Sequence, residues 1–196
     1  MKQGFVKVAS ATPRIRVADP VYNAQVICEQ AKEAAEHGAK IVVFPELCIT
    51  GYTCNDLFLQ ELLLEKAKEA LLTIAEETGQ LETLFLVGLP VDKDGRLYNV
   101  AAVLYRGRIL GMIPKKNIPM YAEFYEGRHF TPGEETVTEY RLGKQVIPFG
   151  SNLLFRCEEL PELILGCELC EDLWVAEPPS TSHALMGATV LSLIHI

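Results

Sequence analysis

The chain has 196 residues, 49% of them hydrophobic and 22% charged, with a formal net charge of −8. This length is enough for one sizeable core, and the acidity argues against general binding to nucleic acid or anionic membranes. No apolar run approaches a membrane span, and the apolar stretch in "MKQGFVKVAS" is too short for a signal peptide. Without an export signal, the six cysteines are expected to be free thiols of a cytoplasmic protein.

The first half of the chain alternates predicted strands and helices. "GFVKVAS" (residues 4–10) predicts a strand, and Asp19-Pro20 supplies a helix N-cap followed by proline at the first helical position. Apolar residues at helical spacing follow, and Gly38 provides a stop. "KIVVFPE" (residues 40–46) and "LFLVGLP" (84–90) are typical of strands buried on both faces, with a second helix expected over residues 56–78.

The second half is richer in strands. "RLYNVAAVLY" and "RILGMIP" flank a tight Arg106-Gly107 turn and predict adjacent antiparallel strands. Residues 114–133 are polar and aromatic with several Pro and Gly, which predicts a long ordered loop with a functional role. "NLLFRCEE" and "ELILGCEL" predict two more strands and "STSHALMGA" a short helix. Helices interleaved with buried strands indicate an α/β or α+β layered domain.

The C-terminal residues differ from the rest. After "GATVL" the chain ends in "SLIHI", which is hydrophobic and has no turn or cap. We therefore expect residues 192–196 to be an atypical tail, produced either by truncation of the domain or by loss of the reading frame near Ser192. A natural C-terminal strand is the alternative.

The segment "GCELCEDLW" contains the pair Cys167 and Cys170, which three kinds of site could use. A redox pair needs both thiols in a turn or at a helix start, but Cys167 ends an apolar strand. A zinc site needs four ligands, and the four histidines are scattered along the chain. The local signatures of Cys-His proteases are missing. Taken alone, Cys170 is therefore best interpreted as a core or strand-end cysteine.

Two further charged residues lie where predicted strands end. Glu46 follows a buried strand among apolar neighbours, so desolvation is expected to raise its pKa and suit it to general-base catalysis. Lys115 follows a strand and a proline, and Glu123 lies eight residues further on among aromatic residues. Each of these charges, considered singly, could equally be solvated in a turn or loop. Considered together with Cys170, they form a plausible set of base, cation and nucleophile.

The ordered set resembles the nitrilase (carbon–nitrogen hydrolase) superfamily. Glu46 lies in "FPELCITGY", Lys115 in "KKNI" and Cys170 in "CEDLW", with separations of 69 and 55 residues. The resemblance covers residues 4–191 and implies an α-β-β-α sandwich with a Glu-Lys-Cys triad. It also implies that Glu123, as the superfamily's second glutamate, hydrogen-bonds Lys115. Metal and cofactor are not expected in such a domain.

Within the superfamily, "PELCITGYTCNDLF", "IPMYAEFYEGRHFTPG" and "CEDLWV" resemble the glutaminase domains of glutamine-dependent NAD⁺ synthetases. This resemblance implies hydrolysis of glutamine and transfer of ammonia to a synthetase domain that uses ATP and Mg²⁺ to amidate nicotinic acid adenine dinucleotide. Tyr121, Glu171 and Trp174 would line the glutamine pocket, with Glu171 near the substrate's α-ammonium group. A homo-oligomer is also expected.

The chain departs from that pattern beyond Leu191, and it contains no "SGGxDS"-type pyrophosphate loop. We therefore expect residues 1–191 to be a truncated glutaminase domain without its synthetase domain, unstable and weakly active when expressed alone. Two other functions stay open. One is a stand-alone amidase that acts on a small amide; the other is a non-catalytic interaction subunit.

Overall fold

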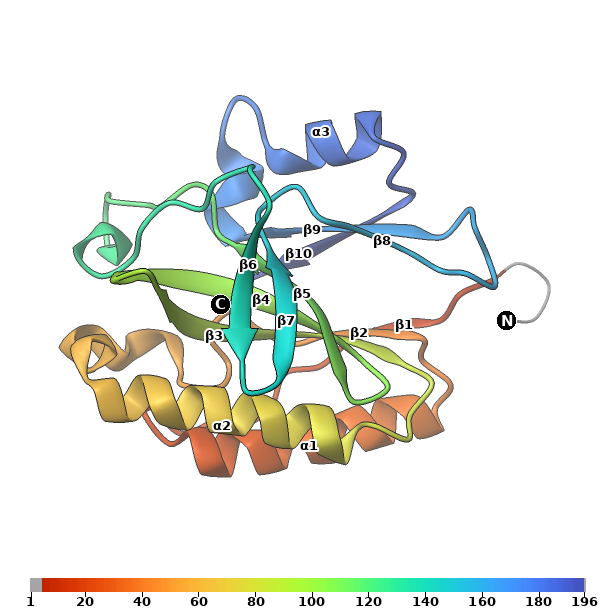
Figure 1. Ribbon diagram of the computed structural model, residues 1–196, viewed down its shortest axis with the longest axis horizontal. Helices are drawn as coiled ribbons and strands as arrows, with labels where there is room; N and C mark the ends of the chain where they lie inside the picture. The colour runs from red at the N-terminus through yellow and green to blue at the C-terminus, as the bar shows by residue number, and fades with distance from the viewer. Residues whose placement is uncertain (1–4, 196) are drawn as a thin grey trace.

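The computed structural model describes residues 5–195 (Figure 1). In chain order the elements are β1 (Val8–Ser10), α1 (Pro20–Glu36), β2 (Ile41–Val43), η1 (Tyr52–Leu59), α2 (Glu61–Glu77), β3 (Leu84–Lys93), β4 (Arg96–Tyr105), β5 (Arg108–Pro114), η2 (Glu126–Arg128), β6 (Thr138–Leu142), β7 (Gln145–Phe149), β8 (Leu154–Arg156), β9 (Ile164–Leu169), η3 (Cys170–Trp174), α3 (Pro179–Leu185) and β10 (Val190–Ile194).

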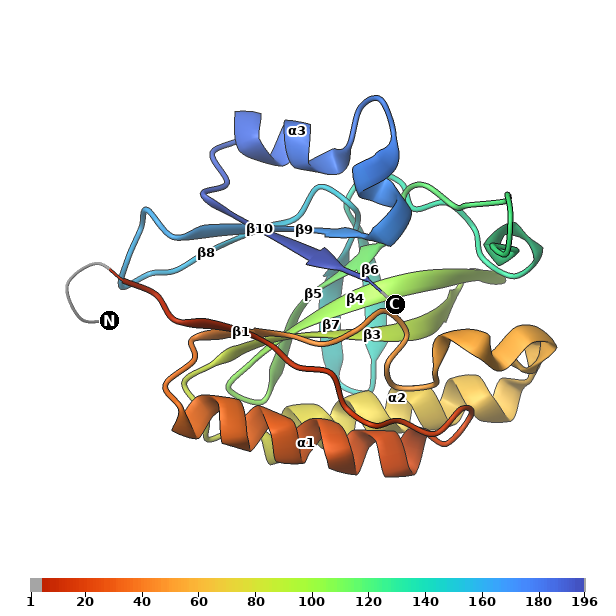
Figure 2. The same cartoon turned by 180° about the vertical axis from the view of Figure 1, so that it is seen from behind.

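A large sheet has the strand order β1-β2-β3-β4-β5-β7-β6. Its first three strands are parallel, and β4 is antiparallel to both of its neighbours, so β2 and β5 run in the same direction. Helices α1 and α2 lie side by side against one face of this sheet (Figures 1 and 2). The apolar side chains between helices and sheet are fully buried and include Ile27, Ala31, Leu71, Ile74, Val42 and Val87.

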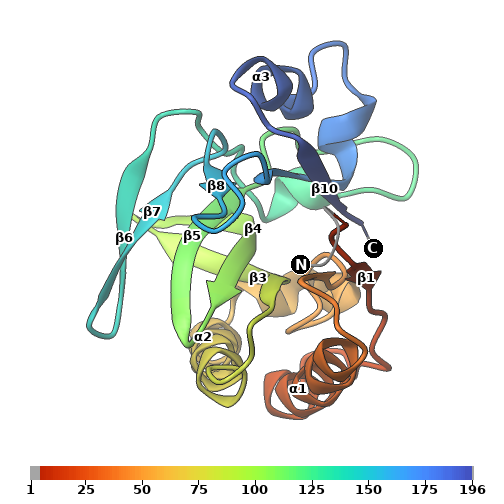
Figure 3. The same ribbon diagram turned by 90° about the vertical axis from the view of Figure 1, so that its right-hand side faces the viewer.

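A smaller sheet, with the order β10-β9-β8, packs on the other face of the large one. The core between the two sheets includes Leu86, Ala101, Val103 and Ile113 from the large sheet and Leu165, Cys167, Leu169 and Ile194 from the small one. Helix α3 covers the outer face of the small sheet, where the His183 ring lies directly over Gly166. Viewed along the strands, the layers are helix, sheet, sheet and helix (Figure 3). The predicted α-β-β-α sandwich is therefore confirmed.

The N-terminal helix forms where the sequence predicts it. Asp19 caps α1, its Oδ1 accepting the Tyr22 N–H at 3.1 Å, and Pro20 occupies the first turn. The next helix differs from the prediction, because α2 begins at Glu61 rather than near residue 56. The preceding residues form the irregular 3₁₀ segment η1, in which Asn55 has a φ of +50° that an α-helix does not allow.

The strands differ from the prediction in two places. β1 begins at Val8 rather than at residue 4, which lies outside the described residues. The hairpin of β6 and β7 was not predicted. β10 extends to Ile194 in parallel register with β9, and the expectation that residues 192–196 are an atypical tail stays a prediction. Ile196 lies outside the described residues. None of the helices in residues 5–195 is long and apolar enough to cross a membrane.

Candidate active site

Glu46, Lys115 and Cys170 meet at one edge of the sandwich. Glu46 follows β2 and Lys115 follows β5, and because these strands run in the same direction both residues lie at the same edge of the large sheet. Cys170 follows β9 of the small sheet, which faces the large one. Three residues separated by 69 and 55 positions in the sequence therefore converge between the sheets, as predicted.

Lys115 is the centre of the cluster and is fully buried. Its Nζ donates to Glu46 Oε1 at 2.7 Å and to Glu126 Oε1 at 2.6 Å. Burial acts to lower the pKa of Lys115, but the two carboxylates outweigh burial and the pKa is raised. The lysine therefore stays a cation at neutral pH, held by two acids in a region closed to water.

Glu46 is held by its loop and by two donors. A Cβ on Gly88 would lie 2.4 Å from the Leu47 nitrogen and 2.7 Å from the Pro45 oxygen, so only glycine lets this loop lie so close to β3. Asn99 Nδ2 donates to Glu46 Oε1 at 2.5 Å, the oxygen that also accepts from Lys115. Oε2 of Glu46 has no hydrogen-bond partner among the described residues.

The electrostatics of Glu46 suit a base. Its pKa is raised, first by burial and further by the negative charge of Glu126, while Lys115 and the Asn99 hydrogen bond act in the opposite direction. A carboxylate with a raised pKa and a free buried oxygen can accept a proton from a nearby donor at neutral pH. The expectation that desolvation raises this pKa is confirmed.

Cys170 is buried, with 3% of its surface exposed, and has a φ of +45°. This left-handed conformation is unfavourable for a residue with a side chain and costs about 1–3 kcal/mol, a strain typical of functional sites. Burial and the Glu46 charge raise the pKa of the thiol to about 12, while Lys115 lowers it. The thiol is therefore protonated at neutral pH and needs a base beside it to become a nucleophile.

The expected role of Glu123 was wrong. Glu123 is exposed in the loop after β5, and the carboxylate that binds Lys115 belongs to Glu126, three residues later. Glu126 is buried at the start of η2, where its Oε1 also accepts from the Tyr52 hydroxyl at 2.8 Å. Burial and this hydrogen bond raise the pKa of Tyr52.

A clamp of Arg128 and His129 on Asp56 joins η2, which carries Glu126, to η1, which carries Tyr52. Arg128, at the end of η2, donates from Nε and Nη2 to the two Asp56 oxygens of η1 at 2.8 and 3.0 Å. His129 Nε2 lies 3.0 Å from the same carboxylate, and these partners hold the pKa of Asp56 well below its usual range. The clamp holds η2 against η1, and the Glu126 side chain itself is held by its bonds from Lys115 and Tyr52.

The residues expected to line a substrate pocket lie near Cys170. The Tyr121 hydroxyl donates to Glu171 Oε2 at 2.7 Å, which brings the loop after β5 next to η3. Trp174, at the end of η3, is 68% exposed. Contact of Tyr121, Glu171 and Trp174 with a substrate stays a prediction.

Four neighbours of the triad were missed: Tyr52, Asn99, Glu126 and Asp172. Tyr52 and Asp172 stand inside the quoted motifs "FPELCITGY" and "CEDLW", so motif membership could have marked them. Asn99 lies on β4 beside Lys115, whose backbone N–H donates to the Asn99 carbonyl at 2.8 Å. The predicted pairing of the two strands around the Arg106-Gly107 turn already places Asn99 beside Lys115, but no local pattern marks its side chain as part of the site.

The pair Cys167 and Cys170 forms no joint site. All six cysteines are free, and Cys167 points into the core between the sheets, where burial raises the pKa of its thiol. In residues 5–195, no three side chains of His, Cys, Asp or Glu gather in a way that could hold a metal ion.

Comparison with known proteins agrees with this geometry. The family model described as carbon-nitrogen hydrolase matches residues 7–195. The chain belongs to this family. The glutamine-dependent NAD(+) synthetase of Mycobacterium tuberculosis is 41% identical over 97% of the chain, and that of Thermotoga maritima is 32% identical over 94%. In both cases the chain spans 28% of the relative's length.

Solved structures of this family share the fold. A glutamine-dependent NAD(+) synthetase from Cytophaga hutchinsonii superposes with a TM-score of 0.84 and 28% identity over 96% of this chain and 30% of that one. An amidase from Nesterenkonia sp. superposes with a TM-score of 0.70 and 22% identity over 96% of this chain and 64% of that one. The amidase likeness concerns the fold alone.

Proposed function

We propose that the chain is a glutamine amidohydrolase domain with Cys170 as nucleophile, Glu46 as general base and Lys115 as the cation that stabilises the oxyanion. The observation that carries this proposal is the buried cluster in which Lys115 binds Glu46 at 2.7 Å next to the strained Cys170. Glutamine is favoured as substrate by the names of the relatives, which are glutamine-dependent synthetases with up to 41% identity to this chain.

The first half of the reaction forms a thioester. Glu46 takes the proton of the Cys170 thiol as the sulfur bonds to the side-chain amide carbon of glutamine, and the carbonyl oxygen becomes an oxyanion. Lys115 lies beside Glu46 and supplies positive charge to that oxygen. Loss of a single oxyanion donor lowers rates by about 10²–10³ in other enzymes, which sets the scale of this contribution. The C–N bond then breaks, and Glu46 returns the proton to the departing ammonia.

The second half releases glutamate. Glu46 takes a proton from water, the hydroxide adds to the thioester carbon, and the C–S bond breaks with return of a proton to Cys170. Glu126 keeps Lys115 charged in both halves, and Asn99 occupies the Glu46 oxygen that does not receive the proton. Glu46 Oε2, free of other partners among the described residues, is the oxygen that carries the proton.

Ammonia release from glutamine by the purified chain tests the proposal. Glutamine should be hydrolysed, Cys170→Ala should abolish the activity, and Cys157→Ala, which changes a half-buried cysteine on another part of the chain, should keep it. A glutamine-analogue diazo-ketone should label Cys170. Faster hydrolysis of short aliphatic amides would favour the stand-alone amidase instead, and a folded chain with neither turnover nor labelling would favour a non-catalytic subunit.

The reaction that would consume the released ammonia requires a second domain. We infer that the partner of this domain is a synthetase domain that uses ATP and Mg²⁺ to amidate nicotinic acid adenine dinucleotide. The support is that the relatives bear the name of that enzyme and that the chain spans 28% of their length. Joined to such a domain, the chain should transfer label from amide-labelled glutamine into the NAD⁺ product. Entry of ammonia from the medium alone would contradict this inference.

A further inference from the structure

Asp172 is a buried acid outside the triad, with 1% of its surface exposed, and it gathers an unusual number of donors. Its Oδ1 accepts from the Asn117 backbone N–H at 2.7 Å, from Asn117 Nδ2 at 2.9 Å and from the Lys116 backbone N–H at 3.2 Å. Its Oδ2 accepts from the Leu169 backbone N–H at 3.1 Å. Both carboxylate oxygens of Asp172 therefore accept hydrogen bonds, and the donors lie on two different segments of the chain.

These two segments are the ones that carry the lysine and the cysteine. Lys116 and Asn117 directly follow Lys115, and Leu169 directly precedes Cys170. The first segment continues β5 of the large sheet, and the second continues β9 of the small sheet. One carboxylate thus joins the ends of two strands that belong to different layers of the sandwich.

We propose that Asp172 is a positioning residue that fixes the distance between the Lys115 ammonium and the Cys170 sulfur. It touches neither reacting atom; it acts by holding the backbone on both sides. The proposal rests on the proposed function, because it gives that distance a catalytic meaning. In a reaction where Lys115 stabilises the oxyanion formed at the carbon that Cys170 attacks, a shift of 1 Å between the two lowers the rate by about 10².

The chemistry of the donors favours an acid at this position. An ionised carboxylate is acceptor-only, and every partner of Asp172 given above is an N–H donor. Burial raises the pKa of Asp172, and the bonds from Leu169, Asn117 and Lys116, which stabilise the charged form, offset only part of this rise. An asparagine in its place would direct an NH₂ group either at the Leu169 N–H or at the donors of Asn117, and would separate the segments.

Asp172→Asn is the direct test, since it keeps size and shape, replaces one acceptor by a donor and removes the negative charge, a charge loss that the control variant shares. A second variant, Asn117→Ala, removes the side-chain bond of 2.9 Å and leaves the backbone bonds of the same residue in place. The matched control is Glu168→Gln. Glu168 is also a buried acid at the end of β9, but it accepts from the Ser180 N–H of α3 at 2.9 Å, on the face away from the site.

Three measurements are made on the folded fraction of each variant. The first is kcat and KM for glutamine, with the enzyme concentration counted as sites that the diazo-ketone labels in a parallel sample (per labelled site). The others are the rate of Cys170 alkylation by iodoacetamide as a function of pH and the melting temperature. Asp172→Asn should lower kcat about 10²-fold with KM changed less than threefold, and should shift the pH profile of alkylation. Asn117→Ala should do the same to a smaller degree. Glu168→Gln should change the melting temperature alone.

The proposal is overturned if kcat and the alkylation profile of Asp172→Asn match the wild type. It is equally overturned if Glu168→Gln loses as much kcat per labelled site, because the effect would then be general loss of structure. Should Asp172→Asn not fold, Asn117→Ala decides by the same two criteria. If the wild-type chain releases no ammonia from glutamine, the proposed function fails, and the alkylation profiles alone decide whether Asp172 positions Cys170.

Discussion

The interior and the outer helical face of the molecule both contain a lysine–glutamate ion pair of nearly the same length. Lys115 Nζ and Glu46 Oε1 are 2.7 Å apart, and neither side chain is exposed. Lys32 on α1 and Glu77 on α2 are 2.8 Å apart, with 46% and 53% of their side chains exposed. Distance alone therefore says little about what an ion pair does; its surroundings decide.

The buried pair is energetically demanding. Removal of two charges from water carries a penalty that their attraction does not reliably offset, and here one cation serves two carboxylates. One oxygen of Glu46 and one of Glu126 have no hydrogen-bond partner among residues 5–195. A buried cation shared by two incompletely paired carboxylates is poorly explained by a gain in stability, so we interpret the cluster as a catalytic site.

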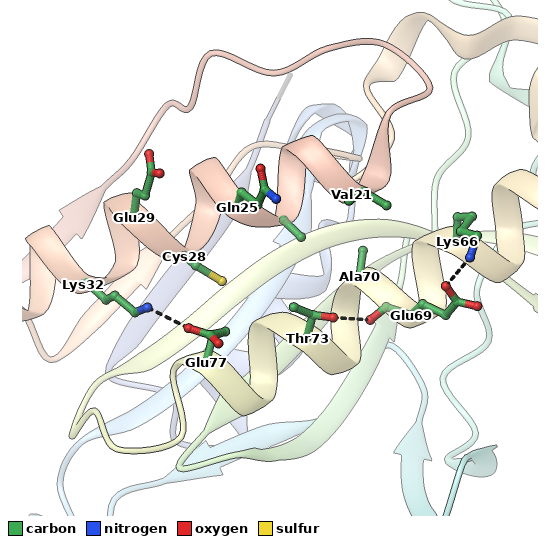
Figure 4. Close-up of a pocket in the computed structure, with 11 residues that line it drawn as sticks. Val21, Gln25, Cys28, Glu29, Lys32, Lys66, Glu69, Ala70, Thr73 and Glu77 are labelled. Carbon is green, nitrogen blue, oxygen red and sulfur yellow. Dashed lines mark hydrogen bonds and ion pairs between the residues drawn. The ribbon is translucent and has the colours of Figure 1, made fainter.

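On the helical face the charges are exposed and the space between them is open, unlike the closed cluster around Lys115. A hollow of about 420 Å³ between α1 and α2 is lined by charges of both signs, including the bridging pair of Lys32 and Glu77 (Figure 4). Cys28 lies in it, and burial raises the pKa of that thiol to about 11. No acid is hydrogen-bonded to this cysteine in the described structure. Open space is thus a poorer guide to the active site than buried charge.

The largest expected effect comes from removal of the buried cation. Lys115→Met leaves two carboxylates facing each other without compensation, so the free energy of unfolding should fall by about 3–5 kcal/mol, as for other broken buried pairs. Glutamine hydrolysis should fall by about 10²–10³-fold, because oxyanion stabilisation is lost as well. Urea unfolding and ammonia release measure the two effects.

A smaller effect should follow from loss of the Asn99 hydrogen bond to Glu46. This bond lowers the pKa of Glu46 while burial raises it, so Asn99→Ala should raise the pKa further. Glu46 must be ionised to act as base, and activity is therefore lost as the pH falls through its pKa. The acid limb of kcat/KM should lie above the ordinary glutamate value of 4.5 in the wild type, and at still higher pH in the variant. A limb that moves to lower pH, or stays in place, would contradict the role of Glu46 as base.

The layered fold and the three residues of the triad could be predicted from the sequence. The triad was predictable because Glu46, Lys115 and Cys170 each lie at or just after the end of a hydrophobic strand and stand in motifs that together resemble one superfamily. The layered fold followed from helices interleaved with buried strands. Both inferences depend on patterns that extend over a few residues.

The rest depends on contacts between distant segments. Glu123 and Glu126 stand in the same aromatic stretch, and the path of the loop through contacts with Lys115 and Tyr52, which no local pattern shows, decides which one is buried. The predicted hairpin of β4 and β5 places Asn99 beside Lys115, but its bond to Glu46 also requires β3 to lie between β2 and β4, an order that the sequence does not show. Asp172 joins two layers that the sequence separates by 55 residues.

The smallest effect should come from the exposed pair. Lys32→Met removes a charge that water and salt already screen, so activity should be unchanged and the unfolding midpoint nearly so. Any stabilisation seen at low ionic strength should disappear in 1 M salt, where the Debye length is about 3 Å. The Lys115→Met effect should persist in the same salt, because ions do not enter the space between the sheets. Equal salt sensitivity in the two variants would mean that water reaches Lys115, and the contrast between the two ion pairs would fail.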